Sequence, residues 1–184
     1  MNIFLGLLRD HGIEAVIDTR SYPKSKFAPQ FDSGPFQELL RSHGITYYFL
    51  GGELGGRPQG SHFYDSGGHV LYGRVAESEF FRQGIDLLLD RIRRFRVAIL
   101  CSEEDPSVCH RRLLIARVLT ASGVAVTHIR GDGTTQSEAE LLTEEATRAA
   151  EDSQLALFEH SPVPEWKSIL SVSPRRPLNN SSLS

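Results

Sequence analysis

The sequence predicts an α/β fold of three layers, α/β/α, with a mostly parallel sheet of about four to five strands, as in Rossmann and flavodoxin-like proteins. Short apolar runs typical of buried strands alternate with longer segments whose apolar residues recur at helical spacing. Each expected strand is followed by polar or glycine-rich residues, as at the carboxyl edge of a parallel sheet. A chain of 184 residues, 40% of them hydrophobic, can bury one core.

The elements follow in chain order from these patterns. β-Branched and aromatic residues predict strands at 14–18, 45–50, 97–100 and 124–129. Helical spacing predicts helices at about 4–11, 36–42, 77–94, 113–119 and 137–152. Two connecting segments, 21–34 and 51–73, are longer than ordinary loops, and loops of that length are often functional. Residues 1–170 are expected to form one domain, and the Ser/Asn/Pro/Arg-rich residues 171–184 a disordered tail.

Composition narrows the class of protein. A net charge of -3 provides no global basic field for nucleic acid, so any anion-binding surface must be local. Two cysteines cannot form a disulfide scaffold, and they suit a reducing cytosol. No window approaches the ~20 apolar residues of a membrane span, and the N-terminus lacks a cleavable signal pattern. We therefore expect a cytoplasmic protein without a membrane partner, whose oligomeric state the sequence leaves unknown.

Segment 101–112 has the highest concentration of potentially reactive side chains in the chain. Cys101 follows an expected strand, and Asp105 with Pro106 is typical of a helix start. Thiols, an imidazole, a carboxylate and guanidinium groups should therefore meet at a strand–loop–helix corner, where a helix N-terminus favours anions. The candidate catalytic residues are Cys101, Glu103, Cys109 and His110.

Two interpretations stay open for each cysteine: a nucleophile activated by its basic neighbours, or a small buried core residue. Zinc would need four ligands, and Cys101, Cys109 and His110 supply three, with His128 as the fourth. Because this spacing is not a zinc-finger pattern, no cofactor is predicted, and zinc or another divalent metal is not favoured. A permanent disulfide is not expected in the cytosol. The phosphatase spacing of Cys and Arg fails, since Ser107 occupies the arginine position.

Arginines and glycines at the strand ends are candidates for binding an anion. Arginine presents a planar fork that fits phosphate or carboxylate oxygens, although Arg20 could instead pair with Asp18 or Glu103. The glycines of 51–56 either bring backbone N–H groups to an anion or form a turn with positive φ. The candidate substrate-binding residues are Arg20, Tyr22, Ser25, Gly51, Gly52, Arg57 and Arg111.

Basic and aromatic residues also share the two long loops, which is typical of surfaces that stack a nucleobase or single-stranded nucleic acid. The alternative is that these loops cover the edge of the sheet with a small hydrophobic cluster of their own.

Three motifs, at 17–27, 50–58 and 101–111, resemble in order and spacing those of the DUF488 family of bacterial and archaeal proteins. The resemblance runs from about residue 2 to 135, and it implies an α/β fold and a candidate site, since the family's function is unassigned. Members of the family usually begin with an additional strand before the first helix. This chain leads straight into that helix, so that strand and one loop of the site are expected to be absent.

These observations predict an enzyme, a hydrolase or transferase, that acts on a phosphate-bearing substrate such as a nucleotide or a nucleic-acid base. Its partner would be an anionic small molecule or nucleic acid. The alternative is a non-catalytic module that binds nucleic acid or a nucleotide at the same edge, and a metal-dependent regulator is a third hypothesis.

Overall fold

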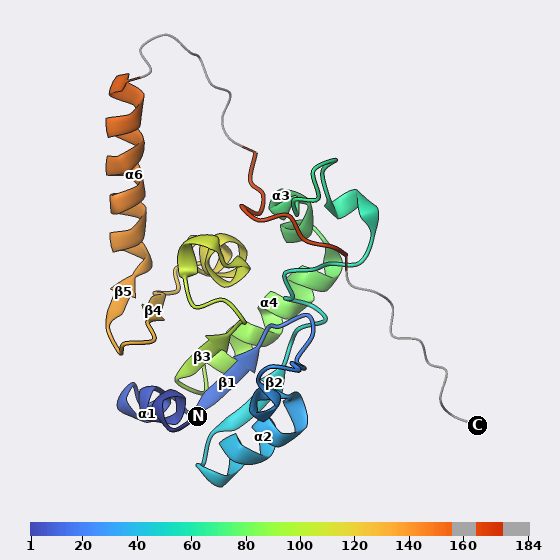
Figure 1. Cartoon of the computed structure of the whole chain (residues 1–184), viewed down its shortest axis with the longest axis vertical. Helices are drawn as coiled ribbons and strands as arrows, with labels where there is room; N and C mark the ends of the chain where they lie inside the picture. Colours follow the sequence, from blue (N-terminus) through green and yellow to red (C-terminus); the bar gives the residue numbers. More distant parts are fainter. Residues whose placement is uncertain (156–164, 175–184) are drawn as a thin grey trace, which may run out of the picture.

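A parallel sheet of three strands forms the centre of the structure, a computed structural model that describes residues 1–155 and 165–174 (Figure 1). Strand β1 at Ala15–Asp18 lies between β2 at Thr46–Phe49 and β3 at Val97–Leu100. Asp18, the last residue of β1, pairs with Phe49 and Leu100, the last residues of its neighbours. The three strands therefore end level, and the loops that follow them leave from one edge, as predicted.

Helices pack on both faces of this sheet. All four residues of β1 are buried, and their side chains alternate between the faces. Val16 packs in an apolar cluster with α1 (Asn2–Asp10) and α2 (Ser33–Ser42). Ile17 packs in a second cluster that includes residues of α3 (Tyr72–Ala76), α4 (Glu79–Ile92) and α5 (Arg117–Ala121). The α/β class is thus confirmed, and assignment to the Rossmann or flavodoxin type stays a prediction.

The predicted fourth parallel strand is wrong. Strand β4 (Thr127–Ile129) pairs antiparallel with β5 (Thr135–Ser137) in a separate hairpin. In the intervening turn Asp132 accepts a hydrogen bond from the Thr134 backbone N–H, and Gly133 has φ 88°. This turn reverses the chain, so the segment pairs with the residues that follow it instead of joining the main sheet. Figure 1 shows the hairpin apart from β1–β3, which leaves a sheet of three strands instead of four to five.

The helix after β3 does not begin at Asp105-Pro106, where the sequence indicated a helix start. Asp105 caps only a 3₁₀ turn at Pro106–Val108, by accepting a hydrogen bond from the Ser107 N–H. The chain is next helical from His110, through a π-helix at Arg111–Ala116 and then α5. His110 thus opens this helix, whereas Cys109 precedes it and its carbonyl accepts a hydrogen bond from the Leu113 N–H.

A buried charge network joins this helix to the hairpin and to α6 (Glu138–Leu155). The Arg112 guanidinium is 2% exposed and donates to Glu138 and Glu145 of α6. Glu138 also lies 2.8 Å from Nε2 of His128 on β4. His128 is therefore committed to this network and is not available as the fourth zinc ligand that the sequence suggested.

The second described segment, 165–174, packs back onto the domain. Trp166 donates from its indole N–H to the Leu113 carbonyl, and Ser168 exchanges hydrogen bonds with the Val70 backbone. Of the predicted tail at 171–184, residues 175–184 lie outside the described residues. Val172, inside them, donates a backbone hydrogen bond to Gly68. The single-domain assignment of 1–170 stays a prediction.

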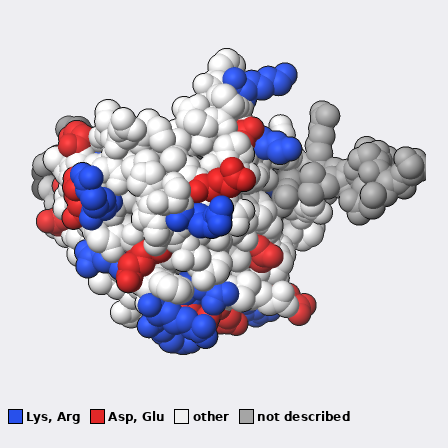
Figure 2. All heavy atoms as spheres, turned by 90° about the horizontal axis from the view of Figure 1, so that it is seen from below, with Lys and Arg blue, Asp and Glu red and all other residues white. Residues whose placement is uncertain are grey.

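No helix within residues 1–155 or 165–174 is long and apolar enough to cross a membrane. On the face shown in Figure 2, Lys and Arg side chains lie close to Asp and Glu side chains over most of the surface. That mixture agrees with the absence of a broad basic field, and any anion site on this face must be a local one.

Arg112→Met should lower the free energy of unfolding by about 3–5 kcal/mol, because it leaves the buried Glu138 carboxylate without its guanidinium partner. Urea unfolding followed by circular dichroism measures this change. Arg82→Met, at an exposed position of α4, is the control and should change the value by less than about 0.5 kcal/mol. A loss below about 1 kcal/mol for Arg112→Met would show that the network does not hold these elements together.

Candidate functional site

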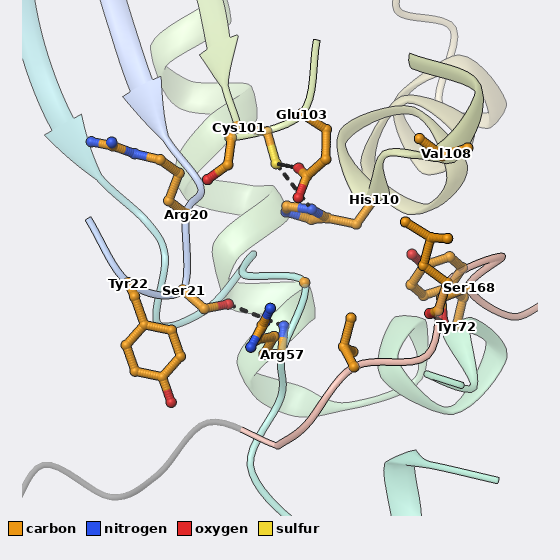
Figure 3. A pocket seen from close by; sticks show the side chains of 14 residues that line it. Arg20, Ser21, Tyr22, Arg57, Tyr72, Cys101, Glu103, Val108, His110 and Ser168 are labelled. Atoms are coloured by element: carbon orange, nitrogen blue, oxygen red, sulfur yellow. Dashed lines mark hydrogen bonds between the residues drawn. The ribbon is translucent and has the colours of Figure 1, made fainter. Parts of the chain in front are cut away.

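Four chemically reactive side chains, those of Cys101, Glu103, Cys109 and His110, converge beyond the end of β3. Figure 3 shows three of them, Cys101, Glu103 and His110. The Cys101 thiol lies 2.5 Å from the Glu103 carboxylate and 3.3 Å from Nδ1 of His110. The Cys109 thiol lies 3.4 Å from the same Glu103 oxygen. One ligating atom from each residue lies within 4.8 Å of the other three. The structure thus brings all four predicted catalytic residues together.

The loop between β3 and the following helix folds this cluster into place. Its 3₁₀ turn redirects the chain, so that Cys109 and His110 return toward the strand end that carries Cys101. Glu104 accepts hydrogen bonds from Arg130 and from the Gly131 N–H, which are 2.8 and 3.0 Å away. The β4–β5 turn therefore braces the loop from outside, although it is not part of the main sheet.

The glycine-rich segment is needed for close approach and not for unusual backbone angles. None of Gly51, Gly55 and Gly56 has a positive φ, so the predicted alternative of a positive-φ turn is wrong for these three. A Cβ on Gly56 would lie 2.7 Å from Nδ1 of His110, and one on Gly55 would lie 2.5 Å from the Ser21 hydroxyl. Their lack of side chains lets this loop press on the His110 ring and fix its position.

The cluster is electrostatically coupled. A hydrogen bond with Cys109 and the positive charge of His110 lower the pKa of the Cys101 thiol. The hydrogen bond with Cys101, together with burial, raises the pKa of the Cys109 thiol. Burial lowers the pKa of His110, but the charge and hydrogen bond of Cys101 and the charge of Glu103 together raise it, and the net shift is upward. Burial, and then the charge of Cys101, raises the pKa of Glu103.

A cleft of about 260 Å³ opens beside this cluster. In Figure 3 Cys101, Glu103 and His110 lie along the upper side of the view, with Ser21, Tyr22 and Arg57 along the lower side. Residues from all three segments that follow the sheet strands, and from the C-terminal segment, line it: Arg20, Ser21, Tyr22, Gly56, Arg57, Cys101, Glu103, His110 and Ser168 are among them.

Two of the predicted binding residues face this cleft with their side chains, Tyr22 and Arg57. The backbone N–H of Arg57 donates to the Ser21 hydroxyl, and no carboxylate among the described residues forms an ion pair with its guanidinium. Tyr22 is 43% exposed. Gly51 and Gly52 belong to the same loop but do not line the cleft.

Arg20 has the structural role that the sequence left as an alternative. Its guanidinium donates to both oxygens of the buried Asp18 carboxylate and to the Phe31 carbonyl. Tyr47 donates to the same carboxylate. Figure 3 shows the guanidinium directed away from the cysteine cluster, so Arg20 holds the loop after β1 in place.

Ser25 and Arg111 also have local partners and do not line the cleft. The Ser25 hydroxyl accepts hydrogen bonds from the Phe27 and Ala28 N–H groups. The Arg111 guanidinium donates to the Glu104 carbonyl, while its backbone N–H donates to the Cys109 sulfur.

Sequence reasoning missed the residues that close the cleft. Gly56 and Ser21 lie within the recognised motifs, but their roles depend on which chain segment they touch. Ser168 and Val172 come from the C-terminal segment and reach the cleft by pairing with residues about a hundred positions earlier. No local pattern around them signals that contact.

Gly56→Ala should lower the free energy of unfolding by about 1–3 kcal/mol, because the added methyl group overlaps the buried His110 ring. Gly73→Ala is the matched control: it lies in α3 with open space around the Cβ position and should raise stability by about 0.5–1 kcal/mol. Chemical denaturation of both variants measures the difference. Equal effects would contradict a close contact between the glycine loop and His110.

The comparison with protein-family models gives one match, Domain of unknown function DUF488, over residues 1–118. Searches of curated proteins and of solved structures found no match. The matched range contains the cluster, the glycine-rich loop and Arg57, whereas the cleft wall at 165–174 lies outside it. Because the match covers more than half of the sequence, the chain belongs to the DUF488 family.

Proposed function

We propose that this protein is an enzyme that binds a phosphate-bearing small molecule in the cleft and transforms it at the Cys101–Glu103–His110 side. One observation carries the proposal: a guanidinium without an ion-pair partner among the described residues shares a cleft with this concentrated set of reactive side chains. A binding cation next to reactive groups is the arrangement expected of an active site.

Arg57 is the anion-binding residue of the proposal. Arg20 is engaged with Asp18, and Arg111 with the Glu104 carbonyl, so neither offers its guanidinium to the cleft. Arg57 is anchored only through its backbone, by Ser21. Its planar fork matches the oxygens of a phosphate group. The cleft, about 260 Å³, is at the small end of ligand pockets. It therefore suits one phosphorylated group or one nucleotide.

Glu103 is the reacting side chain of the proposal, and Cys101 lies beside it in the wall of the cleft. Both line the cleft, whereas the Cys109 thiol lies behind them and is 1% exposed. The exposed Glu103 carboxylate is placed to exchange a proton with a bound substrate, which is the requirement for general acid–base catalysis. Such a site suits a hydrolase or a transferase. We also retain the predicted cytoplasmic location, since two free cysteines suit a reducing compartment.

One observation favours a second function, the binding of single-stranded nucleic acid. Phe27 is 99% exposed on the loop after β1, in a sequence that also holds Lys24 and Lys26. An exposed ring beside cations can stack a base. Phe31, at the end of this loop, instead packs against Phe4 and Phe36 of the core.

Phosphate compounds should stabilise the protein through Arg57. The measurement is a thermal shift of the reduced protein with inorganic phosphate, pyrophosphate, nucleoside monophosphates and a short single-stranded oligonucleotide. A binding phosphate compound should raise the melting temperature of the wild type, and Arg57→Met should weaken its binding by at least about tenfold. Arg82→Met, an exposed arginine away from the cleft, should bind as the wild type does.

A shift that survives Arg57→Met would contradict this assignment of the anion site. Stabilisation by the oligonucleotide alone, abolished by Phe27→Ala and falling steeply with salt, would favour the nucleic-acid-binding module.

Turnover should depend on Glu103 but not on a carboxylate away from the cleft. Any phosphate compound that binds is incubated with the enzyme, and its conversion is followed by phosphorus NMR. Glu103→Gln should lower kcat by at least about 100-fold, because it removes a proton-transfer group. Glu38→Gln, at an exposed position of α2 that does not line the cleft, should leave kcat near the wild-type value. Equal rates for all three proteins would exclude Glu103 as the acid–base group.

A further inference from the structure

We propose that Cys101, Cys109, His110 and Glu103 bind a divalent metal ion, with zinc as the ion that the donor set favours. This inference goes beyond the proposed function, because binding of the ion does not depend on the substrate class. It gives Cys101 and Cys109 the same role, as metal ligands, although the sequence analysis did not favour a metal.

The geometry of the four ligating atoms fits one ion. In a tetrahedral zinc site with Zn–S near 2.3 Å and Zn–N or Zn–O near 2.0–2.2 Å, neighbouring ligand atoms lie about 3.3–3.8 Å apart. Cys101 Sγ and His110 Nδ1 are 3.3 Å apart, and Cys109 Sγ and the Glu103 oxygen are 3.4 Å apart. All four atoms lie within 4.8 Å of one another. The 2.5 Å contact between Cys101 and Glu103 must open by about 1 Å to hold an ion.

The charges of the cluster also call for a cation. Two thiols and a carboxylate can each carry a negative charge, whereas the His110 imidazole and the nearby Arg111 guanidinium are the cations whose charge acts on them. Neither Lys nor Arg forms an ion pair with Glu103 among the described residues. Without a cation, burial and mutual repulsion oppose ionisation of more than one thiol. A divalent ion removes this conflict, since thiolates and carboxylate then become its ligands and protons are released.

The surroundings hold the ligands as the outer shell of a metal site does. The Arg111 backbone N–H donates to the Cys109 sulfur, a contact that favours a thiolate at that position. Gly56 is pressed against the His110 ring and fixes its orientation. Cys109 is 1% and His110 8% exposed, so these ligands are held rigidly in the interior. Such preorganisation increases affinity for the ion.

The same exposure pattern distinguishes Glu103 from the other three ligands. Cys109 and His110 are buried and Cys101 is half-buried, whereas Glu103 is exposed on the cleft side. Cys101, Cys109 and His110 would form the fixed set, and Glu103 the exchangeable fourth ligand. Catalytic zinc sites keep three protein ligands and one exchangeable position. With thiolate and imidazole donors, zinc is favoured over magnesium or calcium, which prefer oxygen.

Cobalt substitution tests the site without any assay of activity. The reduced full-length protein is stripped with a chelator under anaerobic conditions and titrated with Co²⁺. We expect one equivalent to give the visible bands of tetrahedral cobalt and near-ultraviolet charge transfer from thiolate, and zinc to displace both. Cys101→Ser and Cys109→Ser should each reduce the charge-transfer band and weaken binding by at least about tenfold. Glu103→Gln should keep charge transfer and change the visible bands, whereas Glu38→Gln, at an exposed position of α2, should match the wild type.

Absence of thiolate charge transfer in the folded wild-type protein would overturn the proposal, as would bands that persist in the Cys101→Ser/Cys109→Ser double variant. Because Cys109 is buried, circular dichroism accompanies each titration to verify that the variant is folded. Cys101→Ser, at a half-buried position, is decisive by itself. Cobalt binding without any phosphate-dependent thermal shift would support the metal site and count against the proposed function. A phosphate-dependent thermal shift without cobalt binding would support the proposed function and count against the metal site.

Discussion

The level pairing of three parallel strands is the constraint on which the rest of this structure depends. Because Asp18 is in register with both Phe49 and Leu100, the loops after β1, β2 and β3 emerge side by side. One loop is anchored by the buried pair of Arg20 and Asp18. The glycine-rich loop packs against it and against His110, and the cysteine loop completes the edge. The cleft exists because these three loops cannot separate without breaking the sheet.

The candidate site also depends on segments outside the three-stranded sheet. The β4–β5 turn holds the cysteine loop through Glu104, and the Arg112 network fixes the hairpin and α6 to the helix after the cluster. The C-terminal segment closes the cleft by pairing with Val70. The family match ends at residue 118, within the helix after the cluster, and so before the hairpin, α6 and the C-terminal segment. The reactive cluster thus lies within the range of the family match, while the outer wall of the cleft lies beyond it.

Much of this architecture was predictable where the signal is local. The apolar runs located β1, β2 and β3, and the clustering of Cys101, Glu103, Cys109 and His110 followed from their place after a strand. The segment at 124–129 was assigned to the parallel sheet because an apolar run alone does not show whether a strand pairs parallel or antiparallel. The following Asp132-Gly133 is a hairpin signal, and it indicates the antiparallel pairing that the structure has. The pairing of Arg20 with Asp18, the close contact of Gly56 with His110 and the return of Ser168 to Val70 depend on tertiary proximity, which a single sequence does not encode locally.

The central claim is that the cysteine cluster at this sheet edge is a metal centre facing a substrate cleft. Anomalous diffraction at the zinc absorption edge, from crystals grown with zinc under reducing conditions, tests it most directly. The account predicts a peak bounded by Cys101, Cys109 and His110 and reached by Glu103 from the cleft side. An empty cluster, or zinc bound only at other surface residues, would contradict it.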